Sequence, residues 1–286
     1  MGQLREKMIV DLRLRELSPK TCKEYVRCAR EYVAYHRKPA ESMGEDEVRD
    51  FLMHLATVKQ VAPSTRKVSV ASLKFLYGVT LGRPEMAAKI PWPRVVQPLP
   101  EILSGTEVES LLEHVGGAKH RAIVMTTYGT GLRVGEVCAL RVEDIDSKRM
   151  VIQVHKGKGR QDRMVMLPER VLFALRRYWV TERPARPWLF PGVDPEKHIS
   201  ASAVQDNLRS AAKRAGLTKR ATPHVLRHTF ATHLLELGTD IRVIQMLLGH
   251  GSLRTTLRYT RVSTSLVGAT KSPVDVLGTR EQKKIG

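Results

Sequence analysis

The chain has 286 residues, with 48 Lys and Arg against 29 Asp and Glu, so its formal net charge is +19. Its length suits about two domains, and a basic excess spread along the chain favours a polyanion such as nucleic acid over a membrane surface. No apolar run approaches the roughly 20 residues that span a bilayer, and the start of the chain is charged where a secretory signal is apolar, so we expect a cytoplasmic protein.

The first third of the chain predicts a unit of four or five helices. Ser18 and Pro19 are an N-cap with proline at the first helical position, and they open a helix to about residue 35. A second helix is expected over 45–56, and a third follows the sequence APST and stops near Gly78. The segment before Ser18 adds the remaining helical material.

A proline-rich stretch separates this unit from the rest. The sequence IPWPRVVQPLPEIL places prolines at 91, 93, 98 and 100, which rule out a continuous helix and are typical of an extended linker. We therefore expect a helical N-terminal domain over 1–98, a second domain over 99–268 and a C-terminal tail over 269–286.

The second domain predicts helices around a small sheet. Ser104 and Glu107 match a capping box that begins a helix to residue 114, and an apolar helix follows and ends in the YGTG of 128–131. Strands are expected over 151–155 and 163–167, joined by a Gly-rich turn. Helices resume over 202–215 and again from 222, which makes the fold class mainly α with a small β-sheet.

Six polar residues of the second domain are not explained by a helical core. Two guanidiniums can fork onto the non-bridging oxygens of a phosphodiester at any working pH. A tyrosine hydroxyl can attack phosphorus, but with a pKa near about 10 it requires a base and a cationic surround. Histidine and lysine can move protons in both directions, and nothing in the set requires a metal or a cofactor. The six residues are Arg133, Lys158, His224, Arg227, His250 and Tyr259.

The order of their motifs resembles the tyrosine recombinase (phage integrase) family, most closely its Xer-type site-specific recombinases. TGLRVGEVCAL is followed by GKGR in a hairpin, by HVLRHTFATHLLELG and by IQMLLGHGSLRTTLRYT. HxxR alone is weak evidence, whereas this order on these elements over about 103–262 is specific. The resemblance implies a SAM-like core-binding domain followed by an α+β tyrosine recombinase catalytic domain.

The resemblance also implies a role for each of the six residues. Arg133 and Arg227 would clamp the phosphate, and Tyr259 would attack it to form a 3′-phosphotyrosine. His224 would assist proton transfer, and His250 would hydrogen-bond the phosphate.

Lys158 would protonate the leaving 5′ hydroxyl. From the residues alone, a solvated charge cluster is the alternative for Lys158, because Lys156 and Arg160 flank it in the same turn and a hairpin tip usually carries such a cluster.

A metal site is not expected. His224 and His228 have the i, i+4 spacing of zinc ligands, but no glutamate follows His224 as HExxH requires. Cys22, Cys28 and Cys138 are scattered without CxxC spacing, which favours reduced, packed thiols.

The functional prediction is a site-specific DNA recombinase that cuts and rejoins duplex DNA without ATP or a divalent ion. Double-stranded DNA is the expected partner, and four protomers should meet on synapsed DNA. Two alternatives are a type IB topoisomerase-like enzyme and a catalytically silent DNA-binding accessory protein. An RNA-binding module is disfavoured, because no aromatic stacking motif such as RNP1 is present.

Overall fold

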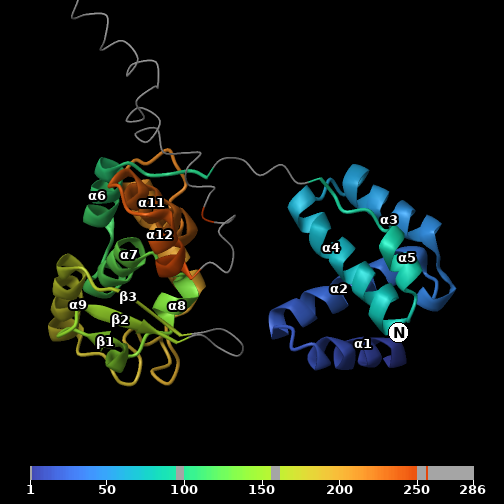
Figure 1. Ribbon diagram of the computed structural model, residues 1–286, viewed down its shortest axis with the longest axis horizontal. Helices are drawn as coiled ribbons and strands as arrows, with labels where there is room; N and C mark the ends of the chain where they lie inside the picture. Colours follow the sequence, from blue (N-terminus) through green and yellow to red (C-terminus); the bar gives the residue numbers. More distant parts are fainter. Residues whose placement is uncertain (1, 95–99, 156–161, 250–255, 257–286) are drawn as a thin grey trace, which may run out of the picture. The chain divides into compact units, whose positions relative to one another are not determined.

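The computed structural model describes residues 2–94, 100–155, 162–249 and 256. The chain divides into two compact units, Met1–Gln97 and Pro98–Gly286, which are described separately below (Figure 1). The described residues are mostly helical with one small sheet, which confirms the predicted fold class. Among them, no helix combines the length and the apolar character needed to cross a membrane.

The N-terminal unit is helical over its described residues, as the sequence predicts. Ser18 caps its second helix, and its hydroxyl accepts a hydrogen bond of 3.1 Å from the backbone N–H of Thr21. A short 3₁₀ turn at Ala40–Ser42 and a π turn at Leu76–Thr80 join longer helices. The α-helices are α1 (Gly2–Leu14), α2 (Pro19–His36), α3 (Glu45–Thr57), α4 (Pro63–Phe75) and α5 (Pro84–Lys89).

The helix expected to stop near Gly78 continues further than the sequence suggests. α4 passes at Phe75 into the π turn, and α5 follows after a short break. A Cβ at Gly78 would lie 3.1 Å from the Cβ of Ala87, so the glycine lets α5 pack closely against the turn. Here glycine serves a close approach between elements, and not the end of a helix.

The core of this unit is built from aromatic and aliphatic side chains of α1 to α5. Tyr32 and Tyr77 are fully buried, and their hydroxyls lie 2.8 Å apart, so each polar tip has a partner inside the core. Phe51 packs edge-on against Tyr32 with the ring centroids 5.4 Å apart. The unit therefore has a complete core of its own.

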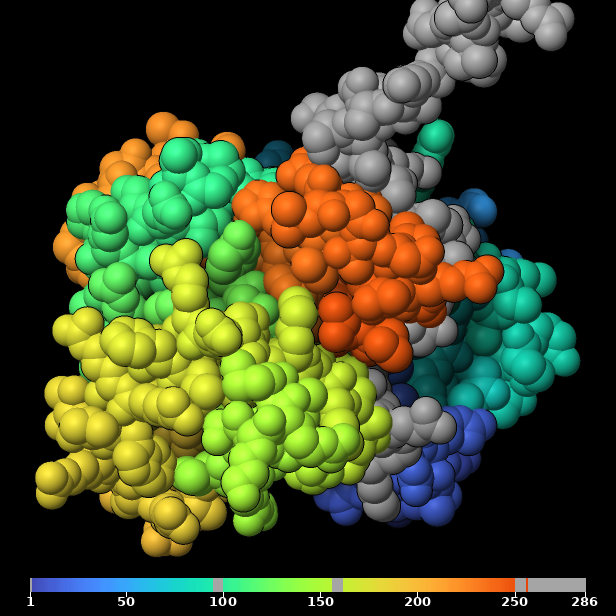
Figure 2. Space-filling view, turned by 60° about the vertical axis from the view of Figure 1, so that its left-hand side comes forward, coloured from blue at the N-terminus to red at the C-terminus, as the bar shows by residue number. Residues whose placement is uncertain are grey.

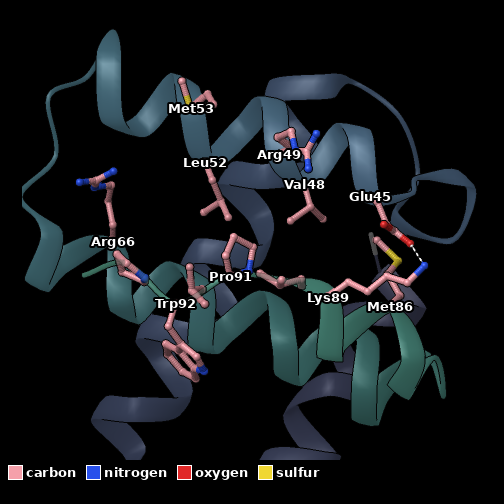
Figure 3. Close-up of a pocket in the computed structure, with 13 residues that line it drawn as sticks. Glu45, Val48, Arg49, Leu52, Met53, Arg66, Met86, Lys89, Pro91 and Trp92 are labelled. Atoms are coloured by element: carbon pink, nitrogen blue, oxygen red, sulfur yellow. Dashed lines mark hydrogen bonds and ion pairs between the residues drawn. The ribbon is translucent and has the colours of Figure 1, made fainter. Parts of the chain in front are cut away.

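A pocket of about 520 Å³ lies between α3, the start of α4 and the segment after α5 (Figure 3). Val48 and Leu52 of α3 point toward Pro91, and the ammonium of Lys89 pairs with Glu45 at 2.5 Å. Ile90, the first residue of the expected proline-rich linker, is buried. The chain thus packs against its own unit for several residues before it leaves.

The second unit surrounds an antiparallel sheet in the order β1-β2-β3. The pairs Ile145↔Ile152 and Val154↔Arg163 fix the register. The strands are β1 (Ile145–Asp146), β2 (Val151–Val154) and β3 (Arg163–Met166), and the helices are α6 (Gly105–His114), α7 (Ala118–Thr130), α8 (Val134–Cys138), α9 (Glu169–Glu182), α10 (Ala201–Arg214), α11 (Pro223–Glu236) and α12 (Ile241–Leu248).

The two predicted strands and the capped helices of this unit are confirmed, each strand ending one residue early. Ser104 and Glu107 form the expected capping box, with the Ser104 N–H donating to the Glu107 carboxylate at 2.7 Å. β1 and α9 were not predicted. β1 is too short to show alternation, and the apolar spacing of α9 is blurred by its exposed Phe173 and Val180.

α7 is the central helix of the unit and packs against both α9 and α11 (Figure 1). It ends at Gly131, whose φ of +65° is left-handed, and a Cβ there would lie 2.3 Å from the ring of Phe230. Gly131 is therefore required both by its backbone conformation and by the close approach of α11. This junction leads directly into Arg133.

Candidate active site

Three arginines from three elements meet at the carbonyl end of α12. Arg163 of β3 donates from Nε to the Leu247 carbonyl at 3.0 Å. Arg227 of α11 donates from Nη2 to the Leu248 carbonyl at 2.6 Å, and Arg133 donates from Nη2 toward the Gly249 carbonyl at 3.4 Å. In Figure 2 the orange surface of α11 and α12 borders the yellow-green surface around the sheet.

The end of a helix is a natural place for such a cluster. The last carbonyls of a helix have no partner within it and carry a partial negative charge, so guanidiniums there satisfy them and complement the helix dipole. Gly249 ends α12 in the left-handed conformation, with φ of 60°. At the other end, the Asp240 side chain accepts from the Arg242 N–H at 2.7 Å and caps the helix.

Arg227 is held inside the unit. Thr222 caps α11 by accepting from the Val225 N–H at 3.2 Å, and Pro223 follows at the first helical position. Arg227 lies in the second turn and is 3% exposed. Its Nη1 donates to the Gly131 carbonyl at 2.6 Å, so the ends of α7 and α12 together fix the guanidinium plane.

Glu136 organises the other two arginines. Arg133 precedes α8, and its backbone N–H and Nη1 both donate to the Glu136 carboxylate, at 2.9 and 3.0 Å. Arg163 donates to the same carboxylate through both Nη atoms, at 3.0 and 2.8 Å, in a bidentate pair. Burial alone would raise the pKa of Glu136, but the hydrogen bonds from Arg163 and Arg133 outweigh it and lower the pKa to about 2.

His224 lies one turn before Arg227 on α11 and is exposed. Its ring packs against that of His228 at a centroid distance of 4.1 Å, and His228 is buried. His233 follows on the same helix, and its Nδ1 forms a hydrogen bond of 2.9 Å with the Tyr128 hydroxyl. His224 is thus the histidine of α11 that faces outward near the arginines.

The structure brings together two of the six predicted residues directly. Arg133 and Arg227 reach the carbonyls of consecutive residues, and His224 is on the same helix as Arg227. The other three predicted residues, Lys158, His250 and Tyr259, lie outside the described residues.

Sequence reasoning missed Glu136 and Arg163. Glu136 stands three residues after Arg133 at the start of a helix, the spacing by which a carboxylate reaches back to a preceding N–H, and this signal was available. The sequence predicts Arg163 only as the start of a strand, because its hydrogen bond to the Leu247 carbonyl of α12 depends on tertiary packing.

The charge of this cluster favours an anion. Among the described residues that make these contacts, there are three guanidiniums and one carboxylate, that of Glu136, which pairs with Arg133 and Arg163. A low-dielectric setting strengthens their attraction for a phosphate, and the guanidiniums stay charged at any working pH. The arrangement can therefore stabilise negative charge that grows on phosphorus oxygens.

Comparison with known proteins agrees with this chemistry. Residues 101–265 match the model of the phage integrase family, and residues 4–85 match that of the phage integrase N-terminal SAM-like domain. The chain is 42% identical to a putative integrase/recombinase of Sinorhizobium fredii, over 97% of this chain and 90% of that protein. It is 37% identical to the tyrosine recombinase XerA of Pyrococcus furiosus, over 82% of this chain and 83% of the relative.

Solved structures show the same fold. The crystal structure of a XerA recombinase is 28% identical, with a TM-score of 0.53 and coverage of 99% of this chain and 98% of that chain. The XerH site-specific recombinase bound to its difH substrate is 22% identical, with a TM-score of 0.71 over 88% of this chain and 79% of that chain. The chain belongs to the phage integrase family and is a tyrosine-type site-specific DNA recombinase.

Proposed function

We propose that this recombinase cuts duplex DNA by attack of Tyr259 on a phosphodiester held between Arg133 and Arg227. The observation that carries the proposal is the meeting of the two guanidiniums at Leu248 and Gly249. The next residue in the chain is His250, and Tyr259 follows nine positions later. The residues at which the two guanidiniums meet, Leu248 and Gly249, therefore shortly precede the proposed nucleophile in the chain.

The clamp acts on charge that develops during the reaction. As the tyrosine oxygen approaches phosphorus, negative charge grows on the two non-bridging oxygens. Guanidiniums already fixed by backbone carbonyls and by Glu136 stabilise that charge without reorganising at the moment of reaction. The bond to the 5′ oxygen breaks as the bond from Tyr259 to phosphorus forms, which leaves a 3′-phosphotyrosine.

Proton transfer falls to the remaining predicted residues. Lys158 donates a proton to the leaving 5′ oxygen, His224 assists proton transfer, and His250 hydrogen-bonds a phosphate oxygen. Attack of a 5′ hydroxyl on the phosphotyrosine reverses each step. Because the phosphodiester energy is kept in the protein–DNA bond, rejoining needs no ATP.

Double-stranded DNA is the proposed substrate, in keeping with the net charge of +19. The XerH structure is a complex with a DNA substrate, and a lambda integrase fragment of the same fold is a dimer bound to a core site. Exchange between two duplexes requires four strand cleavages, so we propose four protomers on synapsed DNA. The tail over 263–286 is the proposed contact between neighbouring protomers.

The test is a suicide substrate nicked near the cleavage site and analysed on a denaturing gel in excess EDTA. Wild-type protein should become joined to the 3′ phosphate. Tyr259→Phe removes one oxygen and keeps the ring, so DNA affinity should hold while the adduct disappears. Tyr128→Phe, a matched change at a tyrosine that bonds His233, should still form the adduct.

An adduct formed by Tyr259→Phe would refute the assignment of the nucleophile. Loss of the adduct in both variants would show that the change acts through folding. Relaxation of supercoiled plasmid without any specific site would favour topoisomerase activity over recombination.

A further inference from the structure

His155 contacts Asp162, and these two residues flank residues 156–161. His155 directly follows β2 and Asp162 directly precedes β3, so both stand next to the Val154↔Arg163 pair, at which the described ladder ends. His155 Nδ1 lies 3.1 Å from Asp162 Oδ2. Lys158 belongs to the segment whose ends this contact connects.

The other ring nitrogen of His155 reaches the body of the unit. Nε2 lies 3.1 Å from Oδ1 of Asp144, which ends the 3₁₀ turn Val142–Asp144 just before β1. Asp144 is 4% exposed, and its Oδ2 accepts from the Arg141 N–H at 2.7 Å. Its Oδ1 is buried and receives no aligned hydrogen bond from the described residues, so His155 is the group placed to offset that charge.

Both contacts at once favour the protonated ring. A neutral imidazole donates from one nitrogen, whereas the imidazolium donates from both and can face two carboxylates. The hydrogen bond to Asp162 is the largest influence and raises the pKa of His155, and the charge of Asp144 acts in the same direction. His155 thus attaches the hairpin to the buried carboxylate of Asp144, which a backbone N–H holds in place.

We propose that His155 is a positioning residue for Lys158, because it ties both ends of residues 156–161 to the buried Asp144. The inference rests on the proposed role of Lys158 as the acid for the 5′ oxygen. The backbone ladder ends at the Val154↔Arg163 pair, and His155 is the side chain that, among the described residues, contacts both Asp162 and Asp144. Loss of His155 should therefore slow the transfer of a proton from Lys158 to the 5′ oxygen.

The experiment compares two suicide substrates, one with the ordinary bridging 5′ oxygen and one with sulfur in its place. Sulfur leaves without a proton, so it bypasses the acid. Lys158→Ala should lose at least about 10² in cleavage rate on the oxygen substrate, as loss of a general acid does, and recover on sulfur. The cleavage rate of His155→Ala should fall about tenfold on the oxygen substrate and should also recover on the sulfur substrate. This loss is smaller than the roughly 10² expected when a catalytic group is misplaced by about 1 Å.

Two further variants sharpen the comparison. Asp162→Ala removes the other half of the hairpin contact and should give the same substrate pattern as His155→Ala. His114→Ala is the matched control, because His114 is an exposed histidine of α6 whose ring bonds the Ser110 carbonyl in its own helix. It should cleave both substrates at the wild-type rate.

The outcomes distinguish the role of His155 from the role of Lys158. If Lys158→Ala recovers on sulfur but His155→Ala is equally slow on both substrates, His155 has a general structural role and the inference is wrong. A wild-type rate for His155→Ala on oxygen overturns it as well. If Lys158→Ala fails to recover on sulfur, the proposed role of Lys158 is wrong and the inference falls with it.

Discussion

At the residue scale, Glu136 fixes the positions of two arginines of the candidate site. It pairs with the guanidiniums of Arg133 and Arg163 while largely buried, with its side chain 14% exposed. Breaking a buried ion pair by removing one partner leaves an uncompensated charge and costs about 3–5 kcal/mol. Glu136 should therefore matter for the stability of the second unit as well as for the arginines.

Glu136→Gln should lower the free energy of unfolding by about 3 kcal/mol at pH 7, because a glutamine turns its NH₂ toward one of the guanidiniums. The pKa of Glu136 is lowered to about 2 in the folded protein, so its contribution is full above the unfolded value near 4.5 and fades as pH falls toward 2. Urea unfolding at several pH values checks this.

The difference between wild type and Glu136→Gln should shrink on acidification below about pH 4.5. Glu143→Gln is the matched control, since Glu143 pairs with Arg141 at the surface and is 71% exposed. It should change stability by no more than about 1 kcal/mol at any pH. A difference for Glu136→Gln that stays constant with pH would show that its ionisation is not the cause.

At the scale of elements, local signals in the sequence predict helix starts well. Side-chain caps at Ser18, Ser104 and Thr222 act through neighbours three residues away, so the sequence contains all that is needed. β1 and the burial of Arg227 depend on distant partners. The same holds for the meeting of Arg133 and Arg163 at α12, which the motifs alone do not show.

The candidate site divides in the same way. The residue types of the site and their order follow from the sequence, because HxxR and the other motifs can be recognised in it directly. The difference between a buried Arg227 and an exposed His224 on one helix follows from the packing of α7 and α12 around α11. Lys158, His250 and Tyr259 remain predictions.

We predict that α4 of the N-terminal unit contacts DNA through its basic residues. It carries Arg66, Lys67 and Lys74 and no acidic residue, and Lys67 lies at the surface. Lys67→Ala should weaken binding to all duplexes about equally and reduce the slope of log affinity against log salt by about one, because one phosphate contact is lost.

Titration of binding to specific and unrelated duplexes at several salt concentrations measures that slope. Lys89→Ala is the matched control in the same unit, since Lys89 is already paired with Glu45 at 2.5 Å. It should leave the slope close to that of wild type. Equal slopes for wild type and Lys67→Ala would exclude Lys67 from the phosphate contacts.

At the scale of the whole molecule, the described core residues fall into separate sets. One cluster draws its buried members from Met8 to Ile90, and the clusters of the second unit draw theirs from Leu103 to Leu248. No described cluster contains residues from both units. Each unit therefore buries enough apolar surface to unfold as its own cooperative body.

This separation predicts that a core defect in one unit stays there. Leu73→Ala, at a fully buried position of α4, should cost about 2–5 kcal/mol through the cavity it leaves. Hydrogen exchange of the full-length chain should then speed up across residues 2–94, with residues 100–249 unchanged. Leu111→Ala, at a fully buried position of α6, is the reciprocal variant and should speed up exchange in the second unit alone. Faster exchange in both units from either change would mean that the two unfold together, and that the proline-rich segment does not separate them energetically.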